Sequence, residues 1–451
     1  MVTAQKILDV PTIGIVSLFR MMPEFRRDSL SAFVEIARRH GGIVRFRGFW
    51  TSFLLTDPEH VEHVLQTNSR NYRKGRVYKE LIPSTGEGLF VTDGEVWRRQ
   101  RRLAQPAFHR NRISSFAGIM TDSTHELLER WRPLAESGTP VQVDAEMLRL
   151  TLGIVGKSLL SRDLSDEAGA VGHSFDVIRE AMMHRLTSFI KLPYSLPTPR
   201  NRRFQRAVAD ADEIVYGLIA ERRRTGSDAD DLLSMLMAAT DEETGEQMSD
   251  KELRDQALTI IGAGYETTTQ ALAWTWYLLA KHPHVEERLH AELESALGGR
   301  TATFENLPDL PYTLMVFQEA MRLYPPAWML SRTAIEDDVI GGHVIPAGSE
   351  ALLLTYLTHR DPRYWEAPDE FDPERFSPER SAARPRFSYF PFGGGPRQCI
   401  GNGFALMEAQ LIIATVAQKY RLRLTDQATI EPEPAVTLRP RGGLRMKLVE
   451  A

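Results

Sequence analysis

Apolar positions along this chain recur mostly with the spacing of helices, and only short stretches alternate as strands do. After Asp57-Pro58, which is typical of a helix start, the helical pattern continues to Gly299. Short strands are predicted at Ile43–Arg47 and Ser52–Thr56, a Gly-Gly hairpin at 339–344, and further strands at 351–357 and 435–448. The pattern predicts a mainly α fold with a minor β sheet, in a single domain covering residues 1–451.

One predicted helix is much longer than the others. It starts at the capping box Ser249-x-x-Glu252 and continues to His282, where Pro283 ends it. At about 1.5 Å per residue it spans about 50 Å, enough to cross the whole molecule. Its middle, residues 262–264, contains two glycines that cost roughly 1 kcal/mol each inside a helix, so we expect a flat ligand to approach there. A second important helix is predicted at Tyr312–Leu323, ended by Pro325-Pro326.

Charge and cysteine content exclude several classes of protein. The 451 residues include 55 Lys and Arg against 60 Asp and Glu, without the basic excess of a nucleic-acid binder. The single cysteine cannot form an internal disulfide or a cysteine-based zinc or iron–sulfur site. The apolar stretch Pro11–Phe19 is too short to span a bilayer, which takes about 20 residues, so we expect a cytoplasmic protein with no membrane span.

The cysteine lies in a glycine-rich loop, Phe392–Gly401, with the pattern Phe-x-x-Gly-x-Arg-x-Cys-x-Gly. The glycines allow the backbone to bend closely around a bulky ligand. Cys399 comes just before the apolar, periodic segment 404–416, so its sulfur is expected near a helix N-terminus. Positive partial charge at that end of a helix favours a thiolate. The loop is therefore the strongest candidate site in the chain.

This loop resembles the haem-binding loop of the cytochromes P-450. Four shorter motifs, in the family's order and spacing, extend the resemblance over nearly the whole chain. They are Trp97-x-x-x-Arg101, Ala263–Thr268, Glu319-x-x-Arg322 and Pro373–Phe376. The resemblance implies the cytochrome P-450 fold, with haem b as the cofactor and Cys399 as the axial ligand of its iron.

The same resemblance implies roles for individual residues. Glu266 and Thr267 are expected to be catalytic, as the acid and the alcohol that deliver protons for O–O cleavage, which thiolate ligation favours. Glu319 and Arg322 share one helix face and are expected to join Arg375 in a structural network beneath the haem. The residues expected to bind the haem are Trp97, Arg101, Ala263, Gly264, Arg332, Phe392, Arg397, Cys399 and Gly401, with Trp97 and the three arginines at the propionates.

The positions where the family usually lines its distal pocket carry no charge, so a lipophilic substrate is expected. They are Phe90, Ala263, Ala327, Trp328, Met329 and Leu330. The apolar run Phe189–Pro197 falls where an access lid is expected, and Lys191 or Arg185 would meet a substrate carboxylate there. A fatty acid is the first expectation for the substrate, and a terpenoid or steroid the second.

The chain has no dinucleotide fingerprint and no flavin module. Electrons are therefore expected from an external ferredoxin or flavodoxin with its reductase, and O2 is expected as the second substrate. A basic face on the cysteine side is the expected docking surface for such an acidic carrier. Its residues are Arg98, Arg102, Arg110 and Arg112.

Two alternatives remain open from the sequence. A haem-thiolate peroxygenase or isomerase would use the same cofactor without O2, although the intact acid–alcohol pair argues against both. A non-catalytic haem sensor or carrier would lack a substrate pocket, which a sequence does not reveal.

Overall fold

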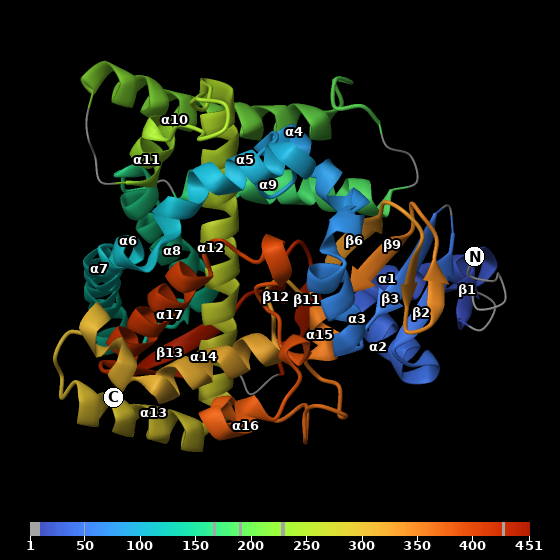
Figure 1. Ribbon diagram of the computed structural model, residues 1–451. Coiled ribbons are helices and arrows are strands. Elements are labelled where there is room, and N and C mark those ends of the chain that lie inside the picture. The colour runs from blue at the N-terminus through green and yellow to red at the C-terminus, as the bar shows by residue number, and fades with distance from the viewer. Residues whose placement is uncertain (1–9, 49, 166–167, 189–191, 227–230, 426–428) are drawn as a thin grey trace.

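Helix α12 (Asp250–Lys281) runs through the middle of the molecule in this computed structural model, and the other elements surround it (Figure 1). On one side lie the largest sheet and the first two helices, and on the other lies a group of long helices. The structure describes residues 10–48, 50–165, 168–188, 192–226, 231–425 and 429–451.

The long central helix forms as its capping box predicts. Ser249 accepts a hydrogen bond from the Glu252 backbone N–H, and the Glu252 side chain accepts one from the Ser249 backbone. His282 is the C-cap before Pro283, so both predicted ends are confirmed. Most of its side chains are buried, polar ones such as Asp255 among them, so the helix forms the core of the fold.

Several long helices pack around α12 and around one another. They are α7 (Ala117–Ser137), α8 (Val143–Leu160), α9 (Ala168–Thr187), α10 (Pro199–Thr225), α13 (Pro283–Ala296), α14 (Pro311–Leu323) and α17 (Asn402–Ala417). Shorter helices near the N-terminal half are α1 (Ile15–Arg27), α2 (Ser29–His40), α3 (Pro58–Glu62), α5 (Gly94–Ala104), α6 (Arg110–Ser114) and α11 (Leu232–Ala238). The prediction of a helix over 312–323 is confirmed by α14.

The largest sheet has six strands in the order β1-β2-β3-β9-β6-β4. Its strands are β1 (Thr12–Gly14), β2 (Ile43–Arg47), β3 (Thr51–Leu55), β4 (Tyr72–Lys74), β6 (Leu330–Ala334) and β9 (Glu350–Leu353). Strands β2 and β3 are antiparallel. Strand β3 lies one residue earlier in the chain than the predicted strand Ser52–Thr56. This sheet brings β4 and β6, which lie far apart in the sequence, into direct antiparallel contact.

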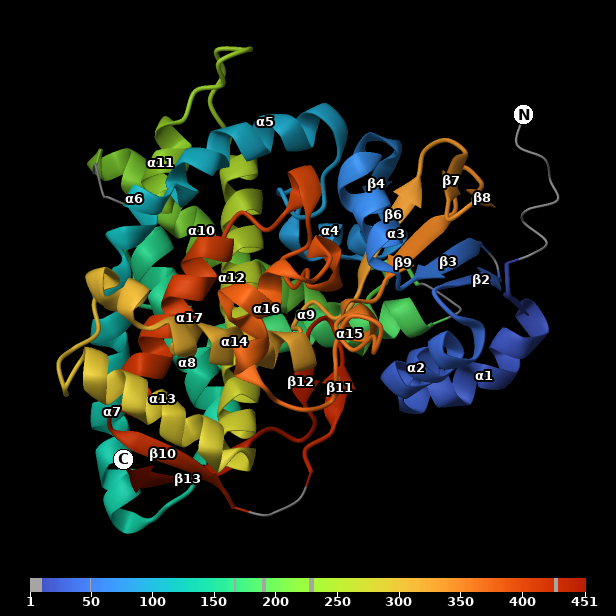
Figure 2. The ribbon, with the colours of Figure 1, turned by 60° about the horizontal axis from the view of Figure 1, so that its bottom comes forward.

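Smaller sheets complete the β structure. They comprise β10 (Tyr420–Leu424) with β13 (Arg445–Glu450) and β5 (Val141–Gln142), β11 (Pro432–Pro434) with β12 (Leu438–Pro440), and the predicted Gly-Gly hairpin β7 (Asp338–Ile340) with β8 (His343–Ile345). The β11–β12 hairpin lies beside α12 in both views (Figure 1 and Figure 2). This position places the turn of the hairpin, with Thr437, against the middle of the central helix.

Two sequence predictions of strands are corrected by the structure. The expected strand over 351–357 ends at Leu353, and α15 (Thr355–Thr358) follows it. The buried Thr358 hydroxyl donates to the Leu354 carbonyl of its own helical turn (3.2 Å) and to the Thr56 carbonyl (2.9 Å), so the turn helps to satisfy this polar group. The expected single strand over 435–448 is the end of one hairpin and the separate strand β13.

The predicted fold class, mainly α with a minor β sheet, is confirmed by these elements. Among the described residues, none of the helices combines the length and the apolar character needed to cross a bilayer.

Candidate active site

The loop that carries Cys399 packs so tightly that two of its positions require glycine. A Cβ at Gly395, where φ is +64°, would lie 1.9 Å from the carbonyl oxygen of Leu65. A Cβ at Gly394 would lie 2.4 Å from the ring of Phe387. The glycines therefore let the loop close onto its neighbours while it presents Cys399 shortly before the start of α17.

The Cys399 side chain has accessible surface, although the surrounding protein limits its hydration. Its backbone N–H donates to the carbonyl of Phe392 over 2.9 Å. Burial raises the pKa of the thiol, and this outweighs the Gly401 N–H and the cations of Arg101 and Lys74, which lower it. The positive end of the helix therefore acts on the sulfur in the direction that favours the thiolate but does not offset burial, and a metal ion bound at the sulfur would favour the thiolate further.

Three basic side chains gather beside this cysteine. Lys74 of β4 lies directly opposite Arg332 of β6, and Arg332 is only 5% exposed. Like charges directly opposite each other on neighbouring strands are destabilising. Burial, and then the charges of Arg332 and Arg397, lower the pKa of Lys74 well below its usual range.

Asp93 is the carboxylate that contacts this basic group among the described residues. It accepts hydrogen bonds from the Lys74 backbone N–H (3.0 Å) and from Arg397 Nη2 (2.6 Å). Arg397 also donates to the Thr92 carbonyl over 2.9 Å and stacks on Trp97, with 4.2 Å between guanidinium carbon and ring centroid. Burial lowers the pKa of Arg397 to about 10.

Arg101 reaches the same region from α5, where its Nη1 donates to the Gln398 carbonyl over 3.0 Å. The enclosed cations are Lys74, Arg101, Arg332 and Arg397. One carboxylate does not balance four cations, and an anion with two further carboxylates would bring the charges closer to balance. Because a cysteine thiolate also binds iron, these residues fit a haem with its iron at Cys399 and its propionates at the cations.

Residues 263–267 of α12 contain the expected oxygen-activating segment. Ala263 is exposed although it lies in the middle of the central helix. The Thr267 hydroxyl donates to the Ala263 carbonyl over 2.7 Å. A Cβ at Gly264 would lie 3.2 Å from Val155 of α8, so packing of the two helices also explains this glycine.

Glu266 points toward the C-terminal hairpin. Its Oε1 accepts a hydrogen bond of 2.8 Å from the hydroxyl of Thr437, and no hydrogen bond joins it to the Thr267 side chain among the described residues. Burial raises the pKa of Glu266, while the Thr437 hydroxyl lowers it. A carboxyl whose pKa is raised can act as a proton donor nearer neutral pH.

The structure brings together the three residues of the expected structural network. Glu319 and Arg322 of α14 are both fully buried and form two hydrogen bonds of 2.7 and 2.8 Å. Arg375 Nε lies 3.2 Å from Glu319 Oε1, an ion-pair distance without good hydrogen-bond geometry. The Asp372 backbone N–H also donates to Glu319 over 3.0 Å. These contacts fasten α14 to the segment around Arg375.

The side chains expected to line the distal pocket differ in exposure. Phe90 is 41% exposed and packs edge-on against Tyr78. Trp328 is only 8% exposed, packs against Leu30 and Leu438, and donates its indole N–H to a backbone carbonyl of the C-terminal hairpin. The partly exposed members of the set are Ala327, Met329 and Leu330. Trp328 therefore contributes mainly to packing behind the pocket wall.

The charge expected at the pocket mouth is already paired. Arg185 forms an ion pair with Glu80 over 2.8 Å, and its guanidinium lies 4.5 Å above the ring of Tyr194. Its Nη1 also donates to the Leu192 carbonyl. Within the expected lid, 189–191 lie outside the described residues, and this includes Lys191. The paired state of Arg185 disfavours its expected contact with a substrate carboxylate.

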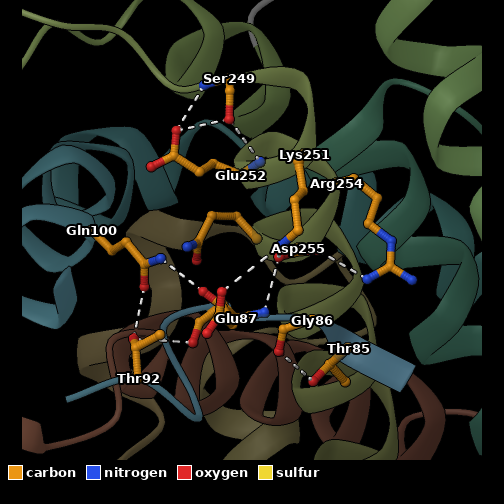
Figure 3. A network of polar contacts seen from close by, with 12 residues as sticks. Thr85, Gly86, Glu87, Thr92, Gln100, Ser249, Lys251, Glu252, Arg254 and Asp255 are labelled. Carbon is orange, nitrogen blue, oxygen red and sulfur yellow. Dashed lines mark hydrogen bonds and ion pairs between the residues drawn. The ribbon is translucent and has the colours of Figure 1, made fainter. Parts of the chain in front are cut away.

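Residues 84–92, here called the distal loop, are fastened to the first turns of α12. Asp255 is 2% exposed and accepts a hydrogen bond of 2.9 Å from the Glu87 backbone N–H. Arg254 pairs with Asp255 (2.9 Å) and donates to the Ser84 carbonyl (3.1 Å). Figure 3 shows Asp255 in the centre of this network, with Gln100 of α5 holding the Glu87 carbonyl from the other side. The network fixes the loop that carries Phe90.

The basic face expected to dock an electron carrier is partly neutralised. Arg98 forms an ion pair with Glu95, and Arg102 pairs with the buried Asp241 over 2.8 Å. Arg102 also contacts Glu243 over 2.9 Å. Arg110 remains at the exposed end of this face. The face therefore carries less net charge than the sequence alone indicates.

Two residues of the site have no sequence motif. Lys74 enters the cation cluster because β4 pairs with β6, and Thr437 reaches Glu266 because the β11–β12 hairpin lies on α12. Both contacts depend on the pairing of segments far apart in the chain. A single sequence carries no signal for that pairing, whereas spacing within one helix or loop is visible directly.

Comparison with known proteins identifies the family. A family model described as Cytochrome P-450 matches residues 10–447. Cyclooctatin synthase of Streptomyces melanosporofaciens is 40% identical over 90% of this chain and 88% of that enzyme. Cyclooctat-9-en-7-ol 5-monooxygenase of the same organism is 39% identical over 88% of this chain and 84% of that enzyme. Pentalenene oxygenase of Streptomyces avermitilis is 33% identical over 97% of this chain and 95% of that enzyme.

The solved structures agree with this comparison. The crystal structure of the haem domain of cytochrome P450DA has a TM-score of 0.89 at 29% identity, covering 98% of this chain and 97% of that domain. The chain therefore belongs to the cytochrome P-450 family and is a haem-dependent monooxygenase.

Proposed function

We propose that this chain binds haem b through Cys399 and uses it to insert one atom of O2 into a terpenoid. The observation that carries the proposal is the group of four enclosed cations beside the single cysteine. Arg101, Arg332 and Arg397 would hold the propionates, with Trp97 stacked on Arg397 and Lys74 as a fourth cation. When bound, the haem supplies the activation of O2, and the protein supplies position, protons and exclusion of water.

Glu266 and Thr267 are the proposed proton-delivery residues on α12. The Thr267 hydroxyl donates to the carbonyl of Ala263, whose side chain is exposed in the middle of α12. Glu266 is enclosed, and its raised pKa suits a group that holds a proton and gives it up during turnover. Glu266 and Thr267, both described by the structure, are not hydrogen-bonded to each other. A proton therefore passes between them only when one of the two side chains rotates or a water molecule lies between them.

A terpenoid is favoured over the fatty acid that the sequence suggested first. The relatives named above oxidise, by their names, pentalenene and cyclooctat-9-en-7-ol, and a third makes cyclooctatin. The paired state of Arg185 weakens the argument for a substrate carboxylate at the mouth. The exposed Phe90 and the uncharged residues 327–330 suit an apolar ring system.

A titration of the ferric holoprotein tests the substrate class. We expect cyclic sesquiterpenes and diterpene alcohols to shift the haem absorption, because they displace water from the iron, and long-chain fatty acids to shift it little or not at all. Tight binding of fatty acids with no response to terpenes would overturn the proposal. Turnover with a ferredoxin and reductase, compared with peroxide alone, tests the source of electrons in the same preparation.

The variant Thr267→Ala tests proton delivery. A positioned proton relay contributes about 10²–10⁴-fold to a rate, so the variant should still consume reductant but lose much of it as hydrogen peroxide. Thr275→Ala is the matched control, because the Thr275 hydroxyl makes the same bond to the carbonyl four residues earlier (2.8 Å) on the same helix. Equal product per electron in the two variants would remove Thr267 from the mechanism.

A further inference from the structure

Thr437 lies between β11 and β12 and is only 5% exposed. Its hydroxyl donates to Glu266 Oε1 over 2.8 Å, across the boundary between the C-terminal hairpin and α12. No motif assigns a role to this threonine. Its contact is with the acid that proton delivery requires.

The backbone on both sides of Thr437 is anchored by indole N–H groups. Trp328 donates to the Ala435 carbonyl over 2.9 Å, and Trp274 of α12 donates to the Leu438 carbonyl over 3.0 Å. Trp274 is fully buried, and the Leu438 N–H donates in turn to the Pro326 carbonyl over 3.0 Å. These bonds fix the hairpin against the helix, so the Thr437 hydroxyl is held in place before any ligand binds.

The charged groups near Glu266 have carboxylate partners of their own. Arg179 of α9 pairs with Asp176 over 2.6 Å. Arg439 of β12 pairs with Glu433 over 2.6 Å. Both arginines lower the pKa of Glu266 through their charge, and Asp176 raises it. Tyr265 is the neighbour of Glu266 on α12. Among the described residues, the Thr437 hydroxyl is the one side-chain group that hydrogen-bonds Glu266.

We propose that Thr437 is a positioning residue for proton delivery, whose hydroxyl holds the Glu266 carboxyl toward the hairpin and stabilises it once its proton has left. The inference rests on the proposed role of Glu266. The O–H of Thr437 donates to the carboxylate, so the contact is strongest when Glu266 is ionised. Thr437 itself gives up no proton. It sets the acidity and the direction of Glu266, which then regains a proton from solvent.

The hydroxyl opposes the effect of burial on Glu266. Burial raises the pKa of this carboxyl, and the Thr437 hydrogen bond is the largest influence that lowers it. Removing the hydroxyl therefore raises the pKa further and leaves the side chain without its fixed partner. A weaker and less ordered acid delivers protons more slowly, so more reductant is lost as hydrogen peroxide.

Thr437→Val tests the proposal, since valine keeps the shape and removes the hydroxyl. The matched variant Thr437→Ser restores a hydroxyl, and Thr437→Ala repeats the test should valine impair folding. The first measurement is the infrared absorption of the protonated carboxyl in the ferric holoprotein as a function of pH, with Glu266→Gln used to assign the band. We expect the midpoint to move to higher pH in Thr437→Val and in Thr437→Ala, and to stay near that of the parent in Thr437→Ser.

The second measurement is product formed per reductant consumed, together with the solvent isotope effect. We expect several-fold more hydrogen peroxide and a larger isotope effect in Thr437→Val than in the parent. When Thr437→Val is added to Glu266→Gln, we expect neither quantity to change further. If Glu266→Gln alone leaves both quantities unchanged, the proposed role of Glu266 fails. If Glu266→Gln impairs coupling while Thr437→Val titrates and couples like the parent, the role of Thr437 is overturned. A change in substrate affinity alone would also overturn it.

Discussion

Lys74 lies over the rings of Tyr78 and Phe90, with 4.3 and 4.8 Å between its Nζ and the two ring centroids. It is also directly opposite Arg332 in the sheet. The rings and the Asp93 contacts offset part of the repulsion, and bound propionates would offset the rest. Lys74 is thus expected to lower the stability of the haem-free chain and to stabilise the chain with haem bound.

Lys74→Met should separate these two effects. Removing one of two opposed cations is expected to raise the stability of the haem-free chain by roughly 1 kcal/mol. The same change should weaken haem retention, because the propionates lose a cation. Thermal unfolding of the haem-free chain and the rate of haem transfer to an acceptor protein measure the two effects. Lys79→Met, at an exposed position in the same segment, is the control. A less stable haem-free chain that retains haem normally would contradict the argument.

Individual residues differ in how far their roles could be predicted from sequence. Glu319 and Arg322 were recognisable because their three-residue spacing fixes them on one face of a helix, and the structure pairs them. Cys399 was recognisable because the glycines around it are required by close packing, which leaves a visible pattern. Lys74 and Thr437 were not, since the first depends on strand pairing and the second on where a hairpin docks.

Among the elements, the distal loop is held mainly by side chains of α12. A Cβ at Gly86, where φ is +68°, would lie 2.0 Å from Asp255 Oδ1, and the loop therefore follows the carboxylate closely. Asp255 accepts from the loop backbone and pairs with Arg254, which itself bonds to Asp212 of α10 over 2.6 Å. One buried carboxylate thus connects the central helix, the loop carrying Phe90 and, through Arg254, the helix above.

Asp255→Asn should loosen this loop. The amide keeps the shape but loses the charge that strengthens the bond to the Glu87 N–H, so we expect a loss of about 1–3 kcal/mol in stability. Weaker binding of an apolar substrate is expected as well, because Phe90 is less well positioned. Lys251→Gln is the control: it removes the ion pair between the exposed Lys251 and the buried Asp255 (2.7 Å), and ion pairs with a solvent-exposed partner contribute little, about 0–1 kcal/mol. Unfolding curves measure the loss of stability, and spectral titrations measure the dissociation constant of the substrate. Equal changes in the two variants would count against the role of the loop network.

Elements with terminal signals were predicted best. The capping box and Pro283 gave both ends of α12 within a residue. The run at 351–357 was misjudged because it is apolar throughout its first half, and periodicity does not separate a short buried strand from a strand followed by a helical turn. Thr358 is 0% exposed, and the turn lets its hydroxyl donate to the Leu354 carbonyl four residues earlier.

At the scale of the whole molecule, the fold class followed from the sequence because most of the chain has helical periodicity around one long central helix. The arrangement of the helices did not, since contacts such as α12 with α8 and α17 depend on which buried faces meet. Glu408 is an example of what this packing encloses. It lies on α17, is 0% exposed, and neither carboxyl oxygen has a hydrogen bond of good geometry among the described residues.

Glu408 gives the stability of the whole molecule a pH dependence. Burial raises its pKa well above the ordinary 4.5, against a smaller lowering by Thr268, so the folded protein keeps it protonated where the unfolded chain has lost that proton. Since the folded state then binds more protons, stability falls as pH rises from about 4.5 toward the folded pKa. Glu408→Gln, which is neutral at every pH, removes this loss.

Glu408→Gln should therefore raise the melting temperature of the holoprotein at pH 7–8 and change it little near pH 4, where Glu408 is protonated in both states. Glu294→Gln, at an exposed position of α13, is the control and should not alter the pH dependence. Thermal unfolding between pH 4 and pH 8 measures the difference between the variants. A Glu408→Gln protein that is destabilised at pH 7–8 but not near pH 4 would mean that the carboxyl is ionised in the folded state and has a partner that stabilises it. Parallel curves for parent and variant would mean that Glu408 does not titrate on unfolding.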